Sequence, residues 1–460
     1  MKLFVRIFTL AILFCWTMWS CSKDHLTSDP EAVNSLTFST GIDTVKFDTV
    51  FTAQGSATQI VKIFNNNSQK ISFSSIDLGG GDASSYLLNI NGRAANSLTD
   101  VILEAGDSLY VFIKVNISPN ATTSPFIVAD SINFRLNGNV EKLYLQAYGQ
   151  NAHYISTANI NKDTTWNADL PIVVMNDILL PTNTKLNIAK GAKVYFHGNT
   201  HLLINGTLNA LGDSLSRIQM TTDRLDDPYN TIAGSWGGLT FGAMSSSNIL
   251  QYTSIKNAQI AIADTSNTSV SSNYKLTLNS CEIYNCSNAG MDAVNSNIYL
   301  YNSLIYNNNY NISIAGGNYN LLYNTIAAYS NNLLGHNNPC VAVTNNSTAL
   351  NLIVKNSIIY GENATISNEL SFDTQLANAQ VSLTNSLLKM STTPTYVMAS
   401  NLILNVDPLF TTVNNDRAIY DFHLQNNSPA LQKALYDNAV LIDYQGNLRS
   451  TTTPTIGAFE

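Results

Sequence analysis

Asn302-Ser303-Leu304-Ile305-Tyr306 is one copy of a short phrase that recurs through the second half of this 460-residue chain. The other copies are Asn279-Ser280-Cys281-Glu282-Ile283-Tyr284, Asn324-Thr325-Ile326, Asn356-Ser357-Ile358-Ile359-Tyr360 and Asn385-Ser386-Leu387-Leu388. Their first asparagines are separated by 23, 22, 32 and 29 residues. Such steps are typical of stacked repeats, and the phrase lacks the 3.6-residue apolar period of helical repeats. The pattern predicts a parallel β-helix in which loops are inserted at the two wider steps.

Vertical stacking follows from this fold, because each side chain of a β-helix lies over its counterpart in the next coil. We therefore expect the asparagines to form a hydrogen-bonded ladder and the isoleucines to form a dry column. Short strand-like segments separated by turn residues continue back to about Thr164. The predicted β-helix spans residues 160–405 and has about ten coils, well above the minimum of about three for a solenoid.

A different pattern occupies residues 36–150, where apolar and polar residues alternate along separated segments. Two examples are Gln59-Ile60-Val61-Lys62-Ile63-Phe64 and Ser108-Leu109-Tyr110-Val111-Phe112-Ile113-Lys114-Val115, and turns such as Asn91-Gly92 lie between the segments. About seven such strands in roughly 115 residues are typical of an immunoglobulin-like β-sandwich. The chain is therefore predicted to be all-β, with the sandwich first and the β-helix second.

The last residues, 406–460, carry a separate signature. It includes Val406-Asp407-Pro408-Leu409-Phe410, Asp443-Tyr444-Gln445-Gly446-Asn447-Leu448-Arg449 and Ile456-Gly457-Ala458-Phe459-Glu460. This signature resembles the terminal module of many secreted bacterial β-helices, and the repeats before it resemble right-handed parallel β-helices of the pectate-lyase-like superfamily. The resemblance implies that residues 406–460 cap the open strand edge at the end of the solenoid.

The first residues, 1–20, have the features of a secretion signal. Lys2 and Arg6 precede the apolar stretch 7–19, which is too short to span a bilayer comfortably. Ser20-Cys21 follows and resembles a bacterial lipobox, which implies that Cys21 is acylated and anchors the protein to lipid, with residues 21–35 as a tether. Plain secretion with cleavage elsewhere is the alternative.

Ser22-Lys23-Asp24, directly after the proposed lipid site, is similar to the export tag of Bacteroidetes surface lipoproteins. The sandwich also resembles the immunoglobulin-like domain that precedes β-helices in such lipoproteins. These resemblances imply export to the bacterial outer membrane and leave open whether the protein is exposed at the cell surface.

Charge excludes one class of partner. Charged residues make up 12% of the chain, with 23 Lys and Arg against 31 Asp and Glu, and the basic residues form no cluster. Nucleic-acid binding requires clustered cations that displace counterions from phosphates. The sequence therefore predicts that nucleic acid is not a partner.

Carboxylates within the predicted β-helix are too few and too scattered to indicate a catalytic site. A glycoside hydrolase needs two carboxylates across the scissile bond, and a lyase needs a base beside a uronate. The tight cluster Asp223-Arg224-Leu225-Asp226-Asp227-Pro228 is interpreted as a solvated loop, with a calcium or catalytic role as the alternative. No catalytic residue is assigned.

Metal and cofactor sites are not predicted either. Cys281, Cys286 and Cys340 are interpreted as small apolar residues in inward columns. His197 and His201 do not share a helical face, and His336 is interpreted as loop surface.

Tyrosines are the strongest functional candidates, and we assign Tyr299, Tyr301, Tyr306 and Tyr310 as glycan-binding residues. Strand alternation places the first two on one face. Aromatic faces beside asparagine amides can stack on sugar rings and hydrogen-bond to them. The alternative is that these rings stack between coils and only stabilise the solenoid.

The sequence therefore leaves two functions from different classes open. The first is a non-catalytic lipoprotein of the cell envelope whose β-helix binds glycans or mediates surface adhesion. The second is a polysaccharide lyase or glycoside hydrolase that acts in a lateral groove of the same scaffold. Two carboxylates and a Lys or Arg converging in one groove would favour the enzyme.

Overall fold

A computed structural model describes residues 25–266, 273–344, 346, 348–373, 376 and 378–460. The chain divides into two compact units, Met1–Asn151 and Ala152–Glu460. The predicted leader and the proposed lipid site at Cys21 lie outside the described residues. Among the residues that are described, no helix is both long and apolar enough to cross a membrane.

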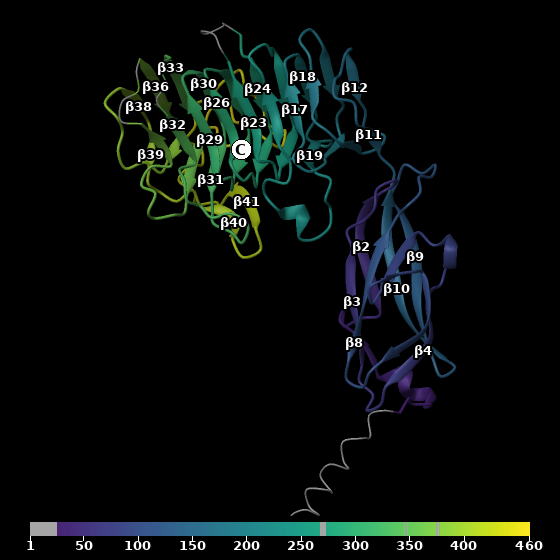
Figure 1. The fold of residues 1–460 in the computed structure, drawn as a ribbon. Coiled ribbons are helices and arrows are strands. Elements are labelled where there is room, and N and C mark those ends of the chain that lie inside the picture. The colour runs from purple at the N-terminus through teal and green to yellow at the C-terminus, as the bar shows by residue number, and fades with distance from the viewer. Residues whose placement is uncertain (1–24, 267–272, 345, 347, 374–375, 377) are drawn as a thin grey trace, which may run out of the picture. The chain divides into compact units, whose positions relative to one another are not determined.

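The first unit is a β-sandwich of two five-stranded sheets (Figure 1). One sheet has the order β1 (Leu36–Phe38), β3 (Gln59–Asn65), β8 (Ser108–Val115), β5 (Tyr86–Ile90) and β6 (Arg93–Ala94). The other has the order β2 (Thr44–Phe51), β10 (Asn139–Gln150), β9 (Phe126–Leu136), β4 (Ile71–Leu78) and β7 (Ser97–Leu103). All pairs are antiparallel except β2 with β10, and alternate residues of the strands fill one core between the sheets.

The segment before β1 belongs to this core, although the sequence analysis placed it in the tether. A short 3-10 helix, η2 (Pro30–Ser35), is capped by Asp29 and buries Ala32 and Val33 against the sandwich. The apolar pair packs into the core, and Leu26 already bridges to Lys70, so the folded unit begins at about Leu26 and the predicted tether would end there. A second 3-10 turn, η3 (Gly81–Ala83), connects β4 to β5.

The second unit is a parallel β-helix built from three sheets. The eleven-stranded sheet contains β11 (His153–Ile155), β13 (Ile172–Val174), β16 (Lys193–Phe196), β19 (Ile218–Thr222), β22 (Thr253–Lys256), β25 (Glu282–Tyr284), β28 (Leu304–Tyr306), β31 (Thr325–Ala328), β34 (Ile358–Gly361), β37 (Leu387–Leu388) and β39 (Ile403–Leu404). The eight-stranded sheet contains β14 (Ile178–Leu180), β17 (His201–Ile204), β20 (Gly238–Phe241), β23 (Ile260–Thr265), β26 (Ala289–Val294), β29 (Tyr310–Ala315), β32 (Val341–Thr344) and β35 (Leu370–Phe372). The ten-stranded sheet contains β12 (Thr164–Trp166), β15 (Lys185–Ile188), β18 (Thr207–Leu211), β21 (Asn248–Gln251), β24 (Leu276–Asn279), β27 (Asn297–Tyr301), β30 (Gly317–Leu322), β33 (Leu350–Lys355), β36 (Ala379–Thr384) and β38 (Val397–Ser400). The predicted all-β fold is therefore confirmed.

The expected dry column is present. Ile283, Ile305, Ile326, Ile359 and Leu388 are paired from coil to coil in the eleven-stranded sheet, and each is fully buried. They belong to one apolar core that runs through the interior of the solenoid. Burial of such columns is the main stabilising term of the fold.

The expected asparagine ladder is wrong in its register and in its chemistry. The ladder is formed by the residue that follows the positive-φ corner residue of each coil: the N–H of Cys281 donates to Ser303 Oγ, that of Ser303 to Asn324 Oδ1, and that of Asn324 to Ser357 Oγ. The phrases that start at Asn279 and Asn324 are offset by one residue from the others. The cause is the stacking of strands, which aligns backbone positions and not residue types.

Corner asparagines have another task. Asn302, Asn356 and Asn385 adopt positive φ values of 52°, 54° and 46°, a conformation that asparagine tolerates better than most residues. Their amides donate to the backbone carbonyls of Ile442, Leu435 and Lys433. They therefore turn the chain and hold the C-terminal residues at the same time.

Those C-terminal residues cover a flank of the solenoid, whereas the sequence analysis expected them to cover its end. The hairpin β40 (Phe410–Asn414) and β41 (Ile419–Leu424) and the residues after it bury the outer face of β28, β31, β34 and β37. The outward position changes from Glu282 on β25 to Leu304 on β28 and Ile358 on β34. A sheet with apolar residues on both faces needs a second layer, and residues 406–460 supply it.

Candidate functional site

The four predicted glycan-binding tyrosines lie on three different sheets. Tyr299 and Tyr301 are on β27 of the ten-stranded sheet, Tyr306 ends β28 of the eleven-stranded sheet, and Tyr310 begins β29 of the eight-stranded sheet. They cannot form one platform, because consecutive sheets of a coil face different directions. Only Tyr299 and Tyr301 share a face.

These two rings form a continuous strip with a third tyrosine. The rings of Tyr299 and Tyr301 stack with centroids 4.6 Å apart, and Tyr274 stacks on Tyr299 at 5.1 Å. Residues two apart on a strand point to the same side, and Tyr274 comes from the coil before. We call Tyr274, Tyr299 and Tyr301 the aromatic strip.

Each ring of the aromatic strip keeps part of its surface accessible. Tyr274 is 38% exposed, and the other two rings are half-buried against Leu322, Tyr323 and Val440. Burial raises the pKa of the Tyr299 and Tyr301 hydroxyls, so both remain protonated at neutral pH. Within the described chain, neither hydroxyl hydrogen-bonds to another protein group, so both can serve a ligand.

Neutral amides surround the strip. Asn297, Asn318 and Asn351 are aligned on β27, β30 and β33, and Asn320 donates from its amide to the Tyr274 hydroxyl over 3.4 Å. The nearby charges of Lys355 and Asp437 neutralise each other in an ion pair of 2.8 Å. The face therefore combines ring surfaces with amide donors and acceptors and has little net charge.

Tyr306 has a structural position. Its ring stacks on Tyr284 at 5.0 Å and meets the edge of Phe422 at 4.9 Å, while its hydroxyl donates to Glu282 Oε1 over 3.0 Å. The C-terminal residues lie against this ring, which leaves it little room for a ligand. Tyr310 is half-buried, apart from the strip.

Three acidic residues of the solenoid each have an internal partner. Asp223 accepts from His197 over 2.7 Å, Asp226 forms a double hydrogen bond with Arg224, and Asp264 pairs with Lys275. Burial raises the pKa of the Asp223 carboxyl, and the His197 contact offsets this only in part. Asp223 is buried, although its cluster was interpreted as a solvated loop. These pairs favour structural roles over an acid–base pair across a groove.

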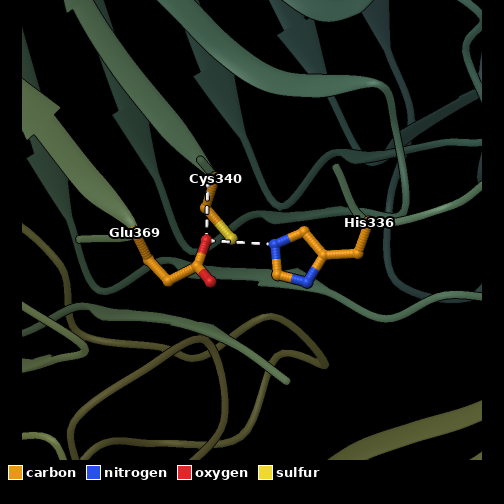
Figure 2. Close-up of side chains that lie close together, drawn as sticks. All are labelled: His336, Cys340 and Glu369. Atoms are coloured by element: carbon orange, nitrogen blue, oxygen red, sulfur yellow. Dashed lines mark hydrogen bonds and ion pairs between the residues drawn. The ribbon is translucent and has the colours of Figure 1, made fainter. Parts of the chain in front are cut away.

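A buried polar cluster escaped the sequence analysis. His336, Cys340 and Glu369 lie together where the eleven-stranded and eight-stranded sheets meet, and they are 4%, 0% and 0% exposed (Figure 2). His336 was interpreted as loop surface, and this is wrong. Cys340 and Glu369 precede β32 and β35, which pair in register, so Glu369 lies directly over Cys340.

Hydrogen bonds connect the three side chains. Glu369 Oε2 is 3.2 Å from His336 Nε2 and accepts from the Cys340 N–H over 3.0 Å. Burial, with the adjacent Glu369 charge, raises the pKa of the Cys340 thiol, which donates to the Tyr360 carbonyl. A side chain at Gly361 would collide with His336 and Glu369, so this glycine keeps space for the cluster.

Comparisons with known proteins add little. No protein-family model matches the sequence, and no curated protein matches it significantly. One similar solved structure is a family 123 glycoside hydrolase from Clostridium perfringens, with 11% identity and a TM-score of 0.18 over 25% of this chain and 26% of that chain. A likeness this low carries no argument about fold or function.

Proposed function

We propose that this protein is an exported, lipid-anchored lipoprotein of the bacterial outer membrane whose β-helix binds glycans without catalysis. The observation that carries the binding part is the aromatic strip, in which three stacked rings and two unpaired hydroxyls lie among asparagine amides. Sugar rings present C–H faces and hydroxyl edges, and this surface offers a partner for both.

The residues around the aromatic strip indicate the charge of the proposed glycan ligand. Asn297, Asn318 and Asn320 are neutral, and Lys355 is already paired with Asp437. An acidic polysaccharide would find no unpaired cation in this set. The proposed ligand is therefore a neutral glycan that lies across β27 and β30.

A non-catalytic function is proposed because acidic side chains of the solenoid are engaged in contacts within the protein. Asp223, Asp226 and Asp264 are occupied by internal cations or imidazole. Glu282 accepts from Ser254 and Tyr306. A hydrolase or lyase would need such groups to face a bound sugar.

The membrane part of the proposal rests on the sequence. Acylation of Cys21 would make lipid the partner that holds the protein at the envelope, and the few residues before Leu26 would connect the anchor to the sandwich. Detergent phase partitioning tests it: the wild type should enter the detergent phase and Cys21→Ala should not. Equal partitioning of the two proteins would contradict the anchor.

Binding is tested by screening the full chain against neutral polysaccharides such as xylan, mannan and β-glucan by affinity electrophoresis. Tyr299→Ala with Tyr301→Ala should weaken binding about fivefold or more, because each lost stacking contact is worth about 0.5–1.5 kcal/mol. Tyr148→Ala is the control, since this sandwich tyrosine is 42% exposed and distant in sequence.

Two results would overturn the proposal. One is unchanged binding by the double variant when its circular dichroism matches that of the wild type. The other is release of reducing ends or unsaturated uronate from a bound polysaccharide, which would favour the enzyme.

A further inference from the structure

The cluster of His336, Cys340 and Glu369 brings three kinds of metal ligand together. Their ligand atoms, an imidazole nitrogen, a thiol sulfur and a carboxylate oxygen, all lie within 4.8 Å of one another. In a tetrahedral zinc site, bonds of about 2.0–2.3 Å place neighbouring ligand atoms roughly 3.3–3.6 Å apart. Small side-chain movements would therefore close the cluster around one ion.

An independent observation points to a missing partner. Glu369 is fully buried, and its Oε1 atom has no hydrogen bond. The Lys389 ammonium lies 3.6 Å from Oε1, but it donates to the carbonyls of Gly361 and Asn363 at 2.8 and 2.7 Å. A buried carboxylate oxygen without a hydrogen bond is costly, and a bound cation would satisfy it.

We propose that His336, Cys340 and Glu369 bind one zinc ion. Thiolate and imidazole donors favour zinc over calcium or magnesium, which prefer oxygen ligands. This proposal is independent of glycan binding.

Position in the fold indicates what the ion would do. His336 and Cys340 belong to the insertion that widens the repeat between β31 and β32, and Glu369 comes from the next coil. A metal bond between them would tie the insertion to the coil beneath it. The three ligands are buried, so the ion would have a structural role, with its fourth tetrahedral position filled by an exogenous ligand such as water.

Binding requires two rearrangements of protons. The thiol proton of Cys340, which is directed at the Tyr360 carbonyl, leaves to solvent as the sulfur bonds to zinc. The His336 Nδ1 atom accepts from the Asn363 N–H over 3.3 Å, so Nε2 carries the ring proton. That proton moves to Nδ1 when Nε2 binds the ion, and the long contact with Asn363 opens.

Metal content tests the proposal directly. The full chain is purified, stripped with a chelator, incubated with zinc and analysed by mass spectrometry for bound metal. We expect one equivalent of zinc per chain. Loading with cobalt instead should produce a near-ultraviolet thiolate-to-cobalt charge-transfer band, which reports a sulfur ligand independently of stability.

Matched cysteine variants locate the site. Cys340→Ser should lose the cobalt band and most of the zinc, whereas Cys286→Ser, which removes another fully buried thiol of the solenoid, should retain both. Failure of the folded wild type to bind zinc at micromolar concentration would overturn the proposal, as would cobalt binding without a thiolate band. The cluster would then be a network in which His336 and Lys389 balance Glu369.

Discussion

Ser357 Oγ accepts a hydrogen bond of 3.0 Å from the backbone N–H of Asn324, which lies 33 residues earlier in the chain and one coil away. Ser357 in turn donates its own N–H to Ser386 Oγ over 3.1 Å. Each ladder residue thus satisfies a buried donor of the coil before it, at a corner where the sheet hydrogen bonds are interrupted.

Removing one step of this ladder should destabilise the solenoid. Ser357→Ala leaves the buried N–H of Asn324 without an acceptor, which costs about 1–3 kcal/mol. Urea denaturation measures this loss. Ser382→Ala, on the outward face of β36, should change stability by less than about 0.5 kcal/mol. Equal effects of the two substitutions would contradict the ladder.

Two substitutions of Asn356 should separate the contribution of its backbone conformation to stability from that of its hydrogen bonds. It has a φ of 54° and exchanges two hydrogen bonds with the backbone of Leu435. Asn356→Gly keeps the conformational freedom and loses the hydrogen bonds, whereas Asn356→Ala loses both. The alanine variant should be less stable than the glycine variant by about 1 kcal/mol in denaturant melts. An alanine variant as stable as the glycine variant would argue against strain at this corner.

Arg449 should hold residues 406–460, the lateral cover, against the flank of the solenoid. Its guanidinium stacks on Tyr323 at 3.9 Å and donates to Asn302 Oδ1 and the Gly457 carbonyl. Arg449→Met should lower stability by about 2–3 kcal/mol, because charged hydrogen bonds are lost from a buried position. Limited proteolysis should then cleave residues 406–460 faster than in the wild type. Arg417→Met, at an exposed turn of the same segment, provides the control.

His423 should make the cover sensitive to pH. Burial disfavours its charged form, but hydrogen bonds with Asp421 and Gln445 outweigh burial and raise its pKa above the ordinary 6.5. A raised folded pKa means that the stabilisation is complete below 6.5 and is lost as pH rises through the folded value. The melting temperature of the wild type should therefore exceed that of His423→Gln at about pH 5.5 and converge with it at about pH 8.5. A difference that does not vary with pH would contradict this.

Several parts of the fold were readable from local chemistry. The spacing of the Asn302 and Asn356 phrases indicated stacked coils, and the isoleucine at the centre of each phrase indicated the dry column. The aromatic candidates Tyr299 and Tyr301 were found because strand alternation places residues two apart on one face. Tyr274 was missed because it precedes its strand and carries no copy of the phrase.

Other parts depend on contacts between distant residues. A signal for the lateral cover did exist: Ile358-Ile359 and Leu387-Leu388 are adjacent apolar pairs, which mark strands buried on both faces. The zinc candidates lacked such a signal. His336 and Cys340 resemble ordinary loop and core residues, and Glu369 is an isolated acid 29 residues further on.

The sequence alone determined the coil and its period, because a repeating pattern of apolar residues and turns fixes how each strand buries its own side chains. Only the tertiary structure decided which residues meet across coils. A shift of one residue at a corner changes the vertical neighbours of a whole phrase. These neighbours form the hydrogen-bond ladder at the corners, the aromatic strip and the buried cluster.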